Sequence, residues 1–257
     1  MTPSALREAA ALLASAWREG RVIGSLPPAL RPRTRAEGYA IQAELDGRPR
    51  AGWKIAATSA AGQRHINVDG PLAGRILAEN MVPVGAPLPL QANRMRVAEV
   101  EFVFVMARDL PPRGAAYTAA EVMAAVAALH LGIEIPDSRY ADFTAVGAPS
   151  LIADDACAGR FVLGPAVTAA WRARDLAAHE VRAQGGVHRH AGSGAQVLGD
   201  PRTALLWLVH ELGRHETVLR AGEFVTTGTC LVPLPVAPGD TVTAEYGDFG
   251  TLRVDFC

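Results

Sequence analysis

One stretch, residues 97–105 with the sequence VAEVEFVFV, constrains the fold more than any other part of the chain. Side chains alternate along a strand, so Glu99 and Glu101 share one face with valines, while the opposite face is wholly apolar. Because neither face suits water, both glutamates are candidates for burial. Two buried like charges need compensation, and hard carboxylate oxygens suit Mg²⁺, Mn²⁺ or Ca²⁺. The alternative is an edge strand whose glutamates reach water.

Size and composition fit a folded protein without a large charged surface. The chain has 257 residues, 49% of them hydrophobic, enough for one large or two modest domains. Its net charge of -1 and scattered basic residues argue against nucleic acid or anionic membranes and favour a small neutral or anionic partner. We expect neither a signal peptide nor a bilayer span. An odd number of cysteines, 3, without CxxC spacing indicates a reducing, cytoplasmic location.

Helix-start and helix-stop signals dominate the first part of the chain. They predict one helix between Thr2 and Gly20 and a second, opened by a capping box, between Thr34 and Gly47. We therefore expect two parts: a helical N-terminal cap, residues 1–50, and a β-rich domain, residues 51–257, that would carry the candidate metal site and any catalytic residues.

Beyond the cap, short apolar runs bounded by turn residues predict strands or extended segments. These are residues 53–57, 83–89, 97–105, 131–135, 160–163, 177–183, 187–190, 224–227, 241–246 and 251–256. Residues 58–74 read as a loop too long for a simple connection, and such loops are commonly functional. One helix is expected after Thr118, with Val126 and Leu129 on its apolar stripe, and another after Asp200. Many strands with few helices favour an α+β, mainly β fold with a largely antiparallel core.

A third carboxylate in an apolar setting, Glu134, lies within the strand predicted at residues 131–135. With Glu99 and Glu101 it could form an oxygen site that leaves positions open for water or substrate. Whether the three meet depends on strand pairing, which the sequence leaves open. Lys54, flanked by apolar residues, is a candidate to bind a substrate carboxylate or, with a lowered pKa, to move a proton. The alternative is a lysine that extends from a strand end into water.

Several familiar site patterns are incomplete. His210 and His215 resemble the HExxH zinc motif, but a separation of five residues turns the two rings about 140° apart on a helix. His188 and His190 face the same way on a strand, although a solvated hairpin edge is the commoner case. The sequence has no GxGxxG, phosphate-loop or GxSxG spacing. Nucleotide binding and serine hydrolase chemistry are therefore unsupported.

Short motifs occur in a fixed order over nearly the whole chain. They are GWKI at 52–55 with TS at 58–59, VAEVEF at 97–102, GIEI at 132–135 with DSR at 137–139, ADDA at 153–156, GSGA at 192–195 with LGDP at 198–201, LRAGE at 219–223 and PGD at 238–240. In this order and spacing the chain resembles the 2-oxopent-4-enoate hydratase and 4-oxalocrotonate decarboxylase branch of the fumarylacetoacetate hydrolase superfamily.

The resemblance implies a distorted β-sandwich or β-roll with a helical N-terminal cap, usually assembled as a homo-oligomer. It implies that Glu99, Glu101 and Glu134 hold Mg²⁺ or Mn²⁺ and that Lys54 is the catalytic residue beside a 2-oxo acid. The implied substrate-binding residues are Ser59, Asp137, Thr227, Gly228 and Thr229. In such a site a 2-oxo or 2-enol carboxylate chelates the metal, and the cation stabilises the enolate that develops.

Three reactions start from such an enolate. Addition of water makes a hydratase, loss of CO₂ makes a decarboxylase, and attack of water on an acyl group makes a C–C hydrolase. We predict a divalent-metal-dependent lyase, a hydratase or decarboxylase, acting on a small 2-oxo or 2-hydroxydienoic acid such as 2-oxopent-4-enoate, as in aromatic catabolism. The alternatives are an acylpyruvate-type C–C hydrolase of the same superfamily and a catalytically silent relative.

Some positions depart from the pattern of this branch. PLAG at 71–74 stands where its members commonly have Pro-Asp-Tyr/Phe-Gly, so an acidic group thought to act on the substrate is missing at Leu72. Asp69 is a candidate to replace it. A usual Asp-Asn pair has become Asp-Asp, which places a second carboxylate at Asp155. The segment 226–233, which we expect to line the pocket, suggests a substrate somewhat different from the pentadienoate.

Overall fold

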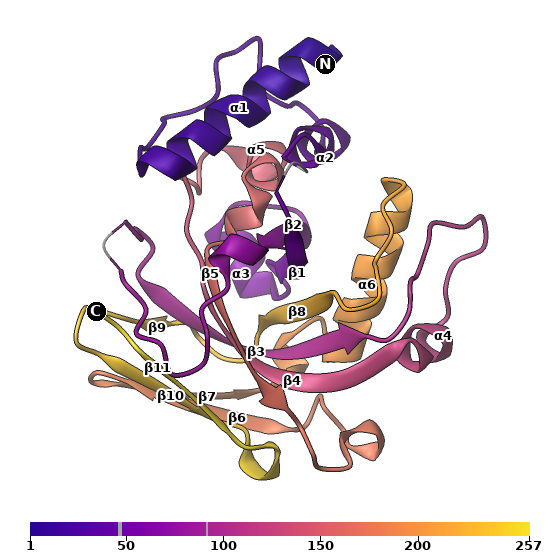
Figure 1. Cartoon of the computed structure of the whole chain (residues 1–257), viewed down its shortest axis with the longest axis vertical. Helices are drawn as coiled ribbons and strands as arrows, with labels where there is room; N and C mark the ends of the chain where they lie inside the picture. Colours follow the sequence, from indigo (N-terminus) through magenta and orange to yellow (C-terminus); the bar gives the residue numbers. More distant parts are fainter. Residues whose placement is uncertain (46–47, 91) are drawn as a thin grey trace.

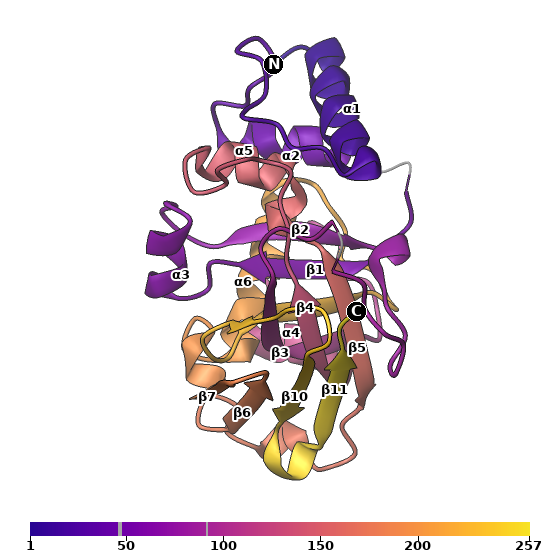
Figure 2. The same cartoon turned by 90° about the vertical axis from the view of Figure 1, so that its left-hand side faces the viewer.

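The computed structural model describes residues 1–45, 48–90 and 92–257, which form three tiers (Figure 1). A helical cap lies at one end, a curled sheet in the middle and a four-stranded sheet at the other end (Figure 2). Within these ranges the α-helices are α1 (Pro3–Glu19), α2 (Arg35–Ala43), α3 (Ala60–His65), α4 (Ala119–Ala124), α5 (Gly147–Ala153) and α6 (Pro201–Arg214). The strands there are β1 (Arg50–Ala56), β2 (Leu72–Leu77), β3 (Val97–Met106), β4 (Val126–Ile135), β5 (Arg160–Ala166), β6 (Glu180–Gly185), β7 (His188–Ser193), β8 (Phe224–Thr229), β9 (Leu234–Pro235), β10 (Thr241–Glu245) and β11 (Thr251–Asp255).

The sheet of the middle tier curls until its two edges meet. Its strands run in the order β2-β1-β8-β3-β4-β5, with β9 paired to the start of β3. Only the pairing of β1 with β8 is parallel among the described strands. Met81, shortly after β2, forms a parallel bridge with Phe161 of β5, so the edge strands close on each other. The predicted mixed, largely antiparallel β-core is confirmed.

The inside of the curled sheet holds a small apolar core. It consists of Ile76, Val103, Ala158, Phe161 and Phe224. The rings of Phe161 and Phe224 stack with their centroids 5.0 Å apart, although β5 and β8 are not neighbouring strands. These rings therefore meet across the interior. Glu101 precedes Val103 by two residues on β3, so strand alternation turns it toward the same interior.

The opposite face of β3 packs toward the four-stranded sheet, whose order is β11-β10-β6-β7. Val100, Phe102 and Phe104 are fully buried in the main hydrophobic cluster, which also contains residues of that second sheet. Tyr246, just after β10, donates a hydrogen bond from its hydroxyl to the carbonyl of Glu101 at 2.9 Å. Since β3 also lies between β8 and β4, it is a central strand buried on both faces, and the edge-strand alternative is wrong.

The cap begins with the helix that the sequence predicts. The Thr2 hydroxyl accepts a hydrogen bond from the Ala5 N–H, and Gly20 ends α1 with a left-handed φ of 63°. The apolar side of α1 joins a cluster that also includes Tyr140 and Ala153 from a distant part of the chain. The cap core is thus completed by the segment that contains α5, and the division of the chain at residue 50 stays a prediction.

The second predicted helix is shorter than expected. The Thr34 hydroxyl accepts from the Glu37 N–H, but the Glu37 carboxylate accepts from the Arg33 N–H instead of completing the capping box. Helix α2 ends at Ala43. The predicted end, Gly47, lies outside the described residues. No helix in the described part of the chain is long and apolar enough to cross a membrane.

Three local predictions are wrong for identifiable reasons. Residues 58–74 contain α3 and the start of β2 instead of a continuous loop; α3 buries none of its side chains, so it has no apolar stripe to detect. Residues 83–89 form no strand, and only Leu88 makes an isolated bridge. Val126 and Leu129 belong to β4, because pairing with β3 overrides a spacing that also fits a helix.

Candidate active site

Strands β3 and β4 bring the three predicted glutamates together. Their antiparallel register sets Glu99 directly opposite Glu134, and Glu101 follows on the same face of β3. One carboxylate oxygen from each residue lies within 4.8 Å of the other two. Glu101 and Glu134 are buried, whereas Glu99 is half-buried. The cluster is therefore reached from the side of Glu99.

Strand β8 fixes the Glu101 carboxylate from the other side. A bulge in the pairing of β3 with β8 allows two donors from β8 to converge on Glu101. The Thr226 hydroxyl and the Gly228 N–H, the latter at 2.6 Å, both donate to Glu101 Oε2. This leaves Glu101 Oε1 for another partner. The sequence predicts Thr226 only as part of a pocket-lining segment, because the bulge that directs its hydroxyl toward Glu101 is not visible in the sequence.

Lys54 reaches the glutamates from β1. Its Nζ lies 3.1 Å from Glu134 Oε1 and donates to the carbonyl of Ala156, also at 3.1 Å. The residue is only 3% exposed, so the alternative of a lysine extending into water is wrong. Each Lys54 contact comes from a different element, which fixes the position of the ammonium group.

The Ala156 carbonyl belongs to an unusual turn. Asp155, Ala156 and Cys157 have φ angles of 48°, 52° and 63°, a left-handed region that costs a non-glycine residue on the order of 1 kcal/mol or more. The turn is held by Arg75, whose N–H and Nε both donate to Asp155 Oδ1 at 3.3 Å. Gly74 makes room for it, since a Cβ there would lie 1.9 Å from the Asp155 carbonyl oxygen. Edge strand β2 thus stabilises the turn that supports Lys54.

The three clustered carboxylates need more positive charge than Lys54 supplies. Burial raises the pKa of Glu134 to about 7, and burial followed by repulsion from Glu134 and Glu99 raises the pKa of Glu101 well above its usual range. Burial would lower the pKa of Lys54, but attraction to Glu134 and the other glutamates raises it above its ordinary value. Three ionised carboxylates and one ammonium would leave two negative charges uncancelled.

The same residues fit a divalent cation. Both oxygens of Glu134 are buried, and neither accepts a well-formed hydrogen bond from the described residues, although Lys54 Nζ is close to one of them. Carboxylate oxygens that lack well-formed hydrogen bonds, in a group of three glutamates, are the ligand set that Mg²⁺ or Mn²⁺ prefers. Glu99, Glu101 and Glu134 are therefore the residues that would hold such an ion, and it would neutralise the remaining charge.

Metal affinity should increase with pH, because a cation must displace protons from these carboxylates. The raised pKa values also stabilise the metal-free fold in acid. Glu134 makes its full contribution to the free energy of unfolding below pH 4.5, the pKa of the carboxyl in the unfolded chain, and this contribution is lost as the pH rises through about 7. Calorimetric Mg²⁺ titrations between about pH 6 and pH 8 and melting curves in chelator would measure both trends. A Mg²⁺ affinity that stays constant over this interval would contradict the expectation.

The other predicted substrate-binding residues differ in whether they contact the three glutamates directly. Gly228 donates directly to Glu101, as described above. The hydroxyls of Thr227 and Thr229 instead donate to the carbonyls of Phe102 and Leu231, at 2.9 and 2.8 Å. Of this segment, the backbone at Gly228 and the unpredicted Thr226 hydroxyl contact the metal-site carboxylates.

Ser59 and Asp137 make local contacts. The Ser59 hydroxyl accepts from the Gly62 N–H and so caps α3. Asp137 is buried, pairs with Arg139 and accepts from the Arg94 N–H at 3.1 Å. The described contacts therefore give both residues structural partners, and their contact with substrate stays a prediction.

Leu72, which stands where the branch commonly has an acidic residue, faces the candidate active site. In the register of β1 with β2, Leu72 lies opposite Ala56 and Gly74 opposite Lys54, so Leu72 and Lys54 share one face of the sheet. Leu72 is fully buried. The Asp69 side chain is 85% exposed and pairs with Arg35, so its contacts hold it in solvent and not beside Lys54. The side chain at the position of the missing acid is thus apolar.

A substitution at Gly228 should test how closely β8 is fitted to the site. Its φ is +106°, and a Cβ would lie 2.2 Å from Thr58 Oγ1, so Gly228→Ala should destabilise the protein by about 2–4 kcal/mol and weaken Mg²⁺ binding. Urea unfolding and Mg²⁺ titration would measure the two effects. Gly213→Ala is the matched control, because Gly213 lies in α6 and an added Cβ would meet nothing within 4 Å. Equal stability of the two variants would contradict the argument.

Comparison with known proteins agrees with this architecture. The family described as fumarylacetoacetate (FAA) hydrolase C-terminal matches residues 71–256, which include β2 to β11 and all three glutamates. The chain belongs to the fumarylacetoacetate hydrolase family. This membership confirms the resemblance seen in the sequence motifs, and it covers most of the part of the chain that carries the site.

Members of the fumarylacetoacetate hydrolase family similar to the chain over its length include a hydratase and a decarboxylase. It is 31% identical to a 2-keto-4-pentenoate hydratase from Paraburkholderia xenovorans (strain LB400) over 263 residues, covering 100% of this chain and 96% of that protein. It is 31% identical to a 4-oxalocrotonate decarboxylase from Pseudomonas sp. (strain CF600) over 235 residues, covering 87% of this chain and 86% of the other.

A solved structure in the family is similar over the whole fold. The 4-oxalocrotonate decarboxylase from Pseudomonas putida G7, complexed with magnesium and adipate, superposes with a TM-score of 0.88 at 27% identity, covering 100% of this chain and 99% of that chain. The predicted β-rich fold with a helical N-terminal region is thereby confirmed. The structure of a protein assigned as a fumarylpyruvate hydrolase, from Burkholderia cenocepacia, has 17% identity and a TM-score of 0.60. This likeness shows the fold alone.

Proposed function

We propose that the chain is a divalent-metal-dependent lyase that hydrates or decarboxylates a small 2-oxo or 2-hydroxydienoic acid, as in aromatic catabolism. The observation that carries this proposal is the cluster of three carboxylates with the Lys54 ammonium 3.1 Å from Glu134. The relatives named hydratase and decarboxylase, each matched over most of its length, support the same class of reaction.

The residues of the cluster have separate roles in this proposal. Glu99, Glu101 and Glu134 hold Mg²⁺ or Mn²⁺, and the G7 decarboxylase complexes with magnesium or calcium support a divalent ion. A cation held there would act as a Lewis acid that stabilises an enolate. The Lys54 ammonium, fixed by Ala156, binds the substrate carboxylate and supplies a proton to the carbon skeleton. Thr226 and Gly228 hold Glu101 in place.

Leu72 alters the far end of the proposed site but does not choose between the two reactions. Hydration of a dienoate needs a group that delivers water or a proton to the far end of the substrate, whereas loss of CO₂ needs an electron sink at the near end. The acidic residue that Leu72 replaces is common to the hydratases and the decarboxylases of this branch. Hydration and decarboxylation therefore both stay in the proposal, with the buried, apolar Leu72 on the face of Lys54.

Product analysis tests the proposal. Purified protein with Mg²⁺ is incubated separately with a 2-hydroxydienoate, a 2-oxo dicarboxylate with an internal double bond, and an acylpyruvate. Gain of water identifies a hydratase, loss of CO₂ a decarboxylase, and cleavage into two acids the alternative C–C hydrolase. No turnover of any of them by metal-loaded protein would overturn the proposal and support a catalytically silent relative. Replacing Mg²⁺ with Mn²⁺ in the same assay identifies the preferred metal.

Three further properties are part of the proposal. The chain forms a homo-oligomer, it works in the cytoplasm, and residues 1–50 act as a cap on the catalytic domain. The predicted absence of nucleic-acid and membrane partners rests on the near-neutral, scattered charge of the sequence. Light scattering after size-exclusion chromatography measures the assembly, and a monomer at assay concentration would contradict the first property.

A further inference from the structure

A cavity lies between the cap and the seam where β2 meets β5. Its volume is about 330 Å³. Trp17 and Arg18 line it from the end of α1, and Glu79 and Arg160 line it from the two sides of the seam. Neither Lys54 nor any of the three glutamates is among its lining residues. It is therefore separate from the metal-site carboxylates and Lys54, although Asp137, one of the predicted substrate-binding residues, lies in its wall.

The lining of this cavity is positively charged. The arginines there are Arg18, Arg48, Arg75, Arg139 and Arg160, and the acids are Glu79, Asp137 and Asp155. Each acid has an arginine partner: Arg48 pairs with Glu79, Arg75 with Asp155, and Arg139 with Asp137. Arg18 and Arg160 form no ion pair with any residue that the structure describes. Two positive charges, one on the cap and one on the seam, thus have no acidic partner among the described residues, although Arg160 also donates to the Glu79 carbonyl at 2.9 Å.

Arg139 places a buried guanidinium in the cavity wall. The residue is 1% exposed, and its guanidinium stacks over the Trp17 ring, with Cζ 4.3 Å from the ring centroid. One end of the guanidinium bonds to Asp137, but its Nε has no hydrogen-bond partner within the described part of the chain. That Nε is shielded from solvent, so Arg139 contributes to the cavity through its positive charge and not through this N–H.

From these observations we infer that the cavity binds a small oxyanion with two negative charges, either a dicarboxylate or inorganic phosphate. Its charge is neutralised by Arg18 of the cap and Arg160 of the seam, beside the buried guanidinium of Arg139 in the cavity wall. The ligand joins the cap to the curled sheet. Asp155 in the cavity wall belongs to the turn whose Ala156 carbonyl contacts Lys54, so the ligand also adjoins the support of the active site.

Binding is measured by calorimetry on metal-free protein with phosphate, succinate and acetate. Phosphate, succinate or both should bind, and acetate at least tenfold more weakly, because it carries one charge. The pattern distinguishes the ligand source: phosphate alone indicates a phosphate compound, succinate alone a dicarboxylate, and both an unselective dianion site. Equal affinity for acetate and the dianions, or no binding of either dianion, would overturn the inference.

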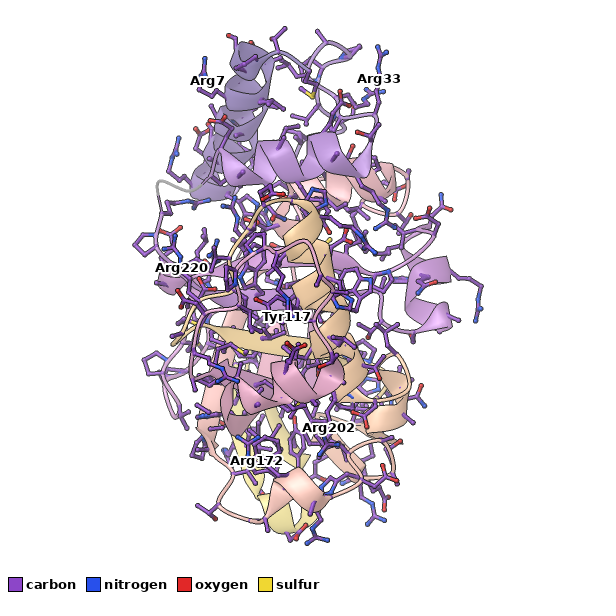
Figure 3. The ribbon with its side chains drawn as sticks, turned by 90° about the vertical axis from the view of Figure 1, so that its right-hand side faces the viewer. Arg7, Arg33, Tyr117, Arg172, Arg202 and Arg220 are labelled. Carbon is purple, nitrogen blue, oxygen red and sulfur yellow. The ribbon has the colours of Figure 1, made fainter. Side chains whose placement is uncertain are left out.

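Variants locate the site. Arg18 and Arg160 are both exposed, so the double variant R18A/R160A should fold normally and bind the dianion at least tenfold more weakly. The matched control is R7A/R33A, which removes two exposed arginines of the cap (Figure 3) that are not among the lining residues of the cavity. It should bind as the wild type does. An unchanged affinity in R18A/R160A, or an equal loss in R7A/R33A, would overturn the inference.

A last variant separates this site from the proposed function. Lys54→Met removes the ammonium of the active site but leaves every lining residue of the cavity intact. Phosphate and succinate should bind to it with wild-type affinity, whether or not the protein turns over any 2-oxo acid. A tenfold loss of affinity in Lys54→Met would place the anion in the active site and overturn the inference.

Discussion

Glu101→Gln should abolish Mg²⁺ binding while the fold is retained. In the wild type both donors to Glu101, the Thr226 hydroxyl and the Gly228 N–H, bond to the same oxygen. A glutamine carbonyl can accept both of these bonds, which turns its NH₂ group toward the position of the cation. Loss of one charge and introduction of N–H donors should weaken Mg²⁺ by at least ~100-fold and lower turnover by about 10³-fold.

The metal-free variant should also be more stable than metal-free wild type, since one of several mutually repelling buried carboxylates is removed. Mg²⁺ titration by calorimetry and melting curves in chelator measure the two effects. Glu245→Gln, on an exposed position of β10, is the control and should change neither. Retention of wild-type Mg²⁺ affinity by Glu101→Gln would show that the cation does not bind to this carboxylate.

Lys54→Met should give the opposite combination, with metal binding kept and catalysis lost. Removing the ammonium beside Glu134 takes away a competing positive charge, so Mg²⁺ should bind as tightly as before or more tightly. Turnover should fall on the order of 10²–10⁴-fold, because the group proposed to bind the substrate carboxylate and supply the proton is missing.

Steady-state kinetics and Mg²⁺ calorimetry on the same preparation measure this combination. Lys54→Arg is the informative companion, because it keeps the positive charge but cannot give up a proton near neutral pH. If Lys54 only binds the carboxylate, Lys54→Arg should recover much of kcat; if it transfers a proton, KM should recover and kcat should not. Wild-type turnover in Lys54→Met would remove Lys54 from the mechanism.

The features that the sequence predicts well are local. Glu99 and Glu101 share a face because strand alternation requires it, and the apolar run around them requires burial. The caps at Thr2, Thr118 and Asp200 were read from two or three neighbouring residues, and all three form. Family, fold and class of reaction followed from the order of many motifs, and the comparisons agree with them.

Features that depend on packing between distant segments were not predictable. The pairing of Glu99 with Glu134 rests on the register of β3 with β4, which no single stretch of sequence sets. The bulge that brings Thr226 to Glu101 is a property of two strands together. Helix α3 has no buried side, so hydrophobic periodicity gives no signal for it.

One departure from the branch pattern has a structural explanation. The second carboxylate of the Asp-Asp pair, Asp155, would be unfavourable in a buried turn without compensation. Arg75, next to Gly74 on β2, supplies that compensation through its Nε and its backbone N–H. This contact joins positions 80 residues apart, so neither residue explains the other in the sequence. The apolar Leu72 has no such counterpart among the described contacts.

The ion pair between Lys54 and Glu134 has a consequence for chemical labelling. All other basic side chains among the 25 lysines and arginines of the sequence are arginines, so Lys54 is the single target for reagents that acylate lysine amines. Held as an ammonium against Glu134, its nitrogen is a poor nucleophile. A cation that takes over the charge of Glu134 weakens this protonation. The acylation rate of one amine, followed by mass spectrometry, thus reports directly whether the carboxylates hold a metal.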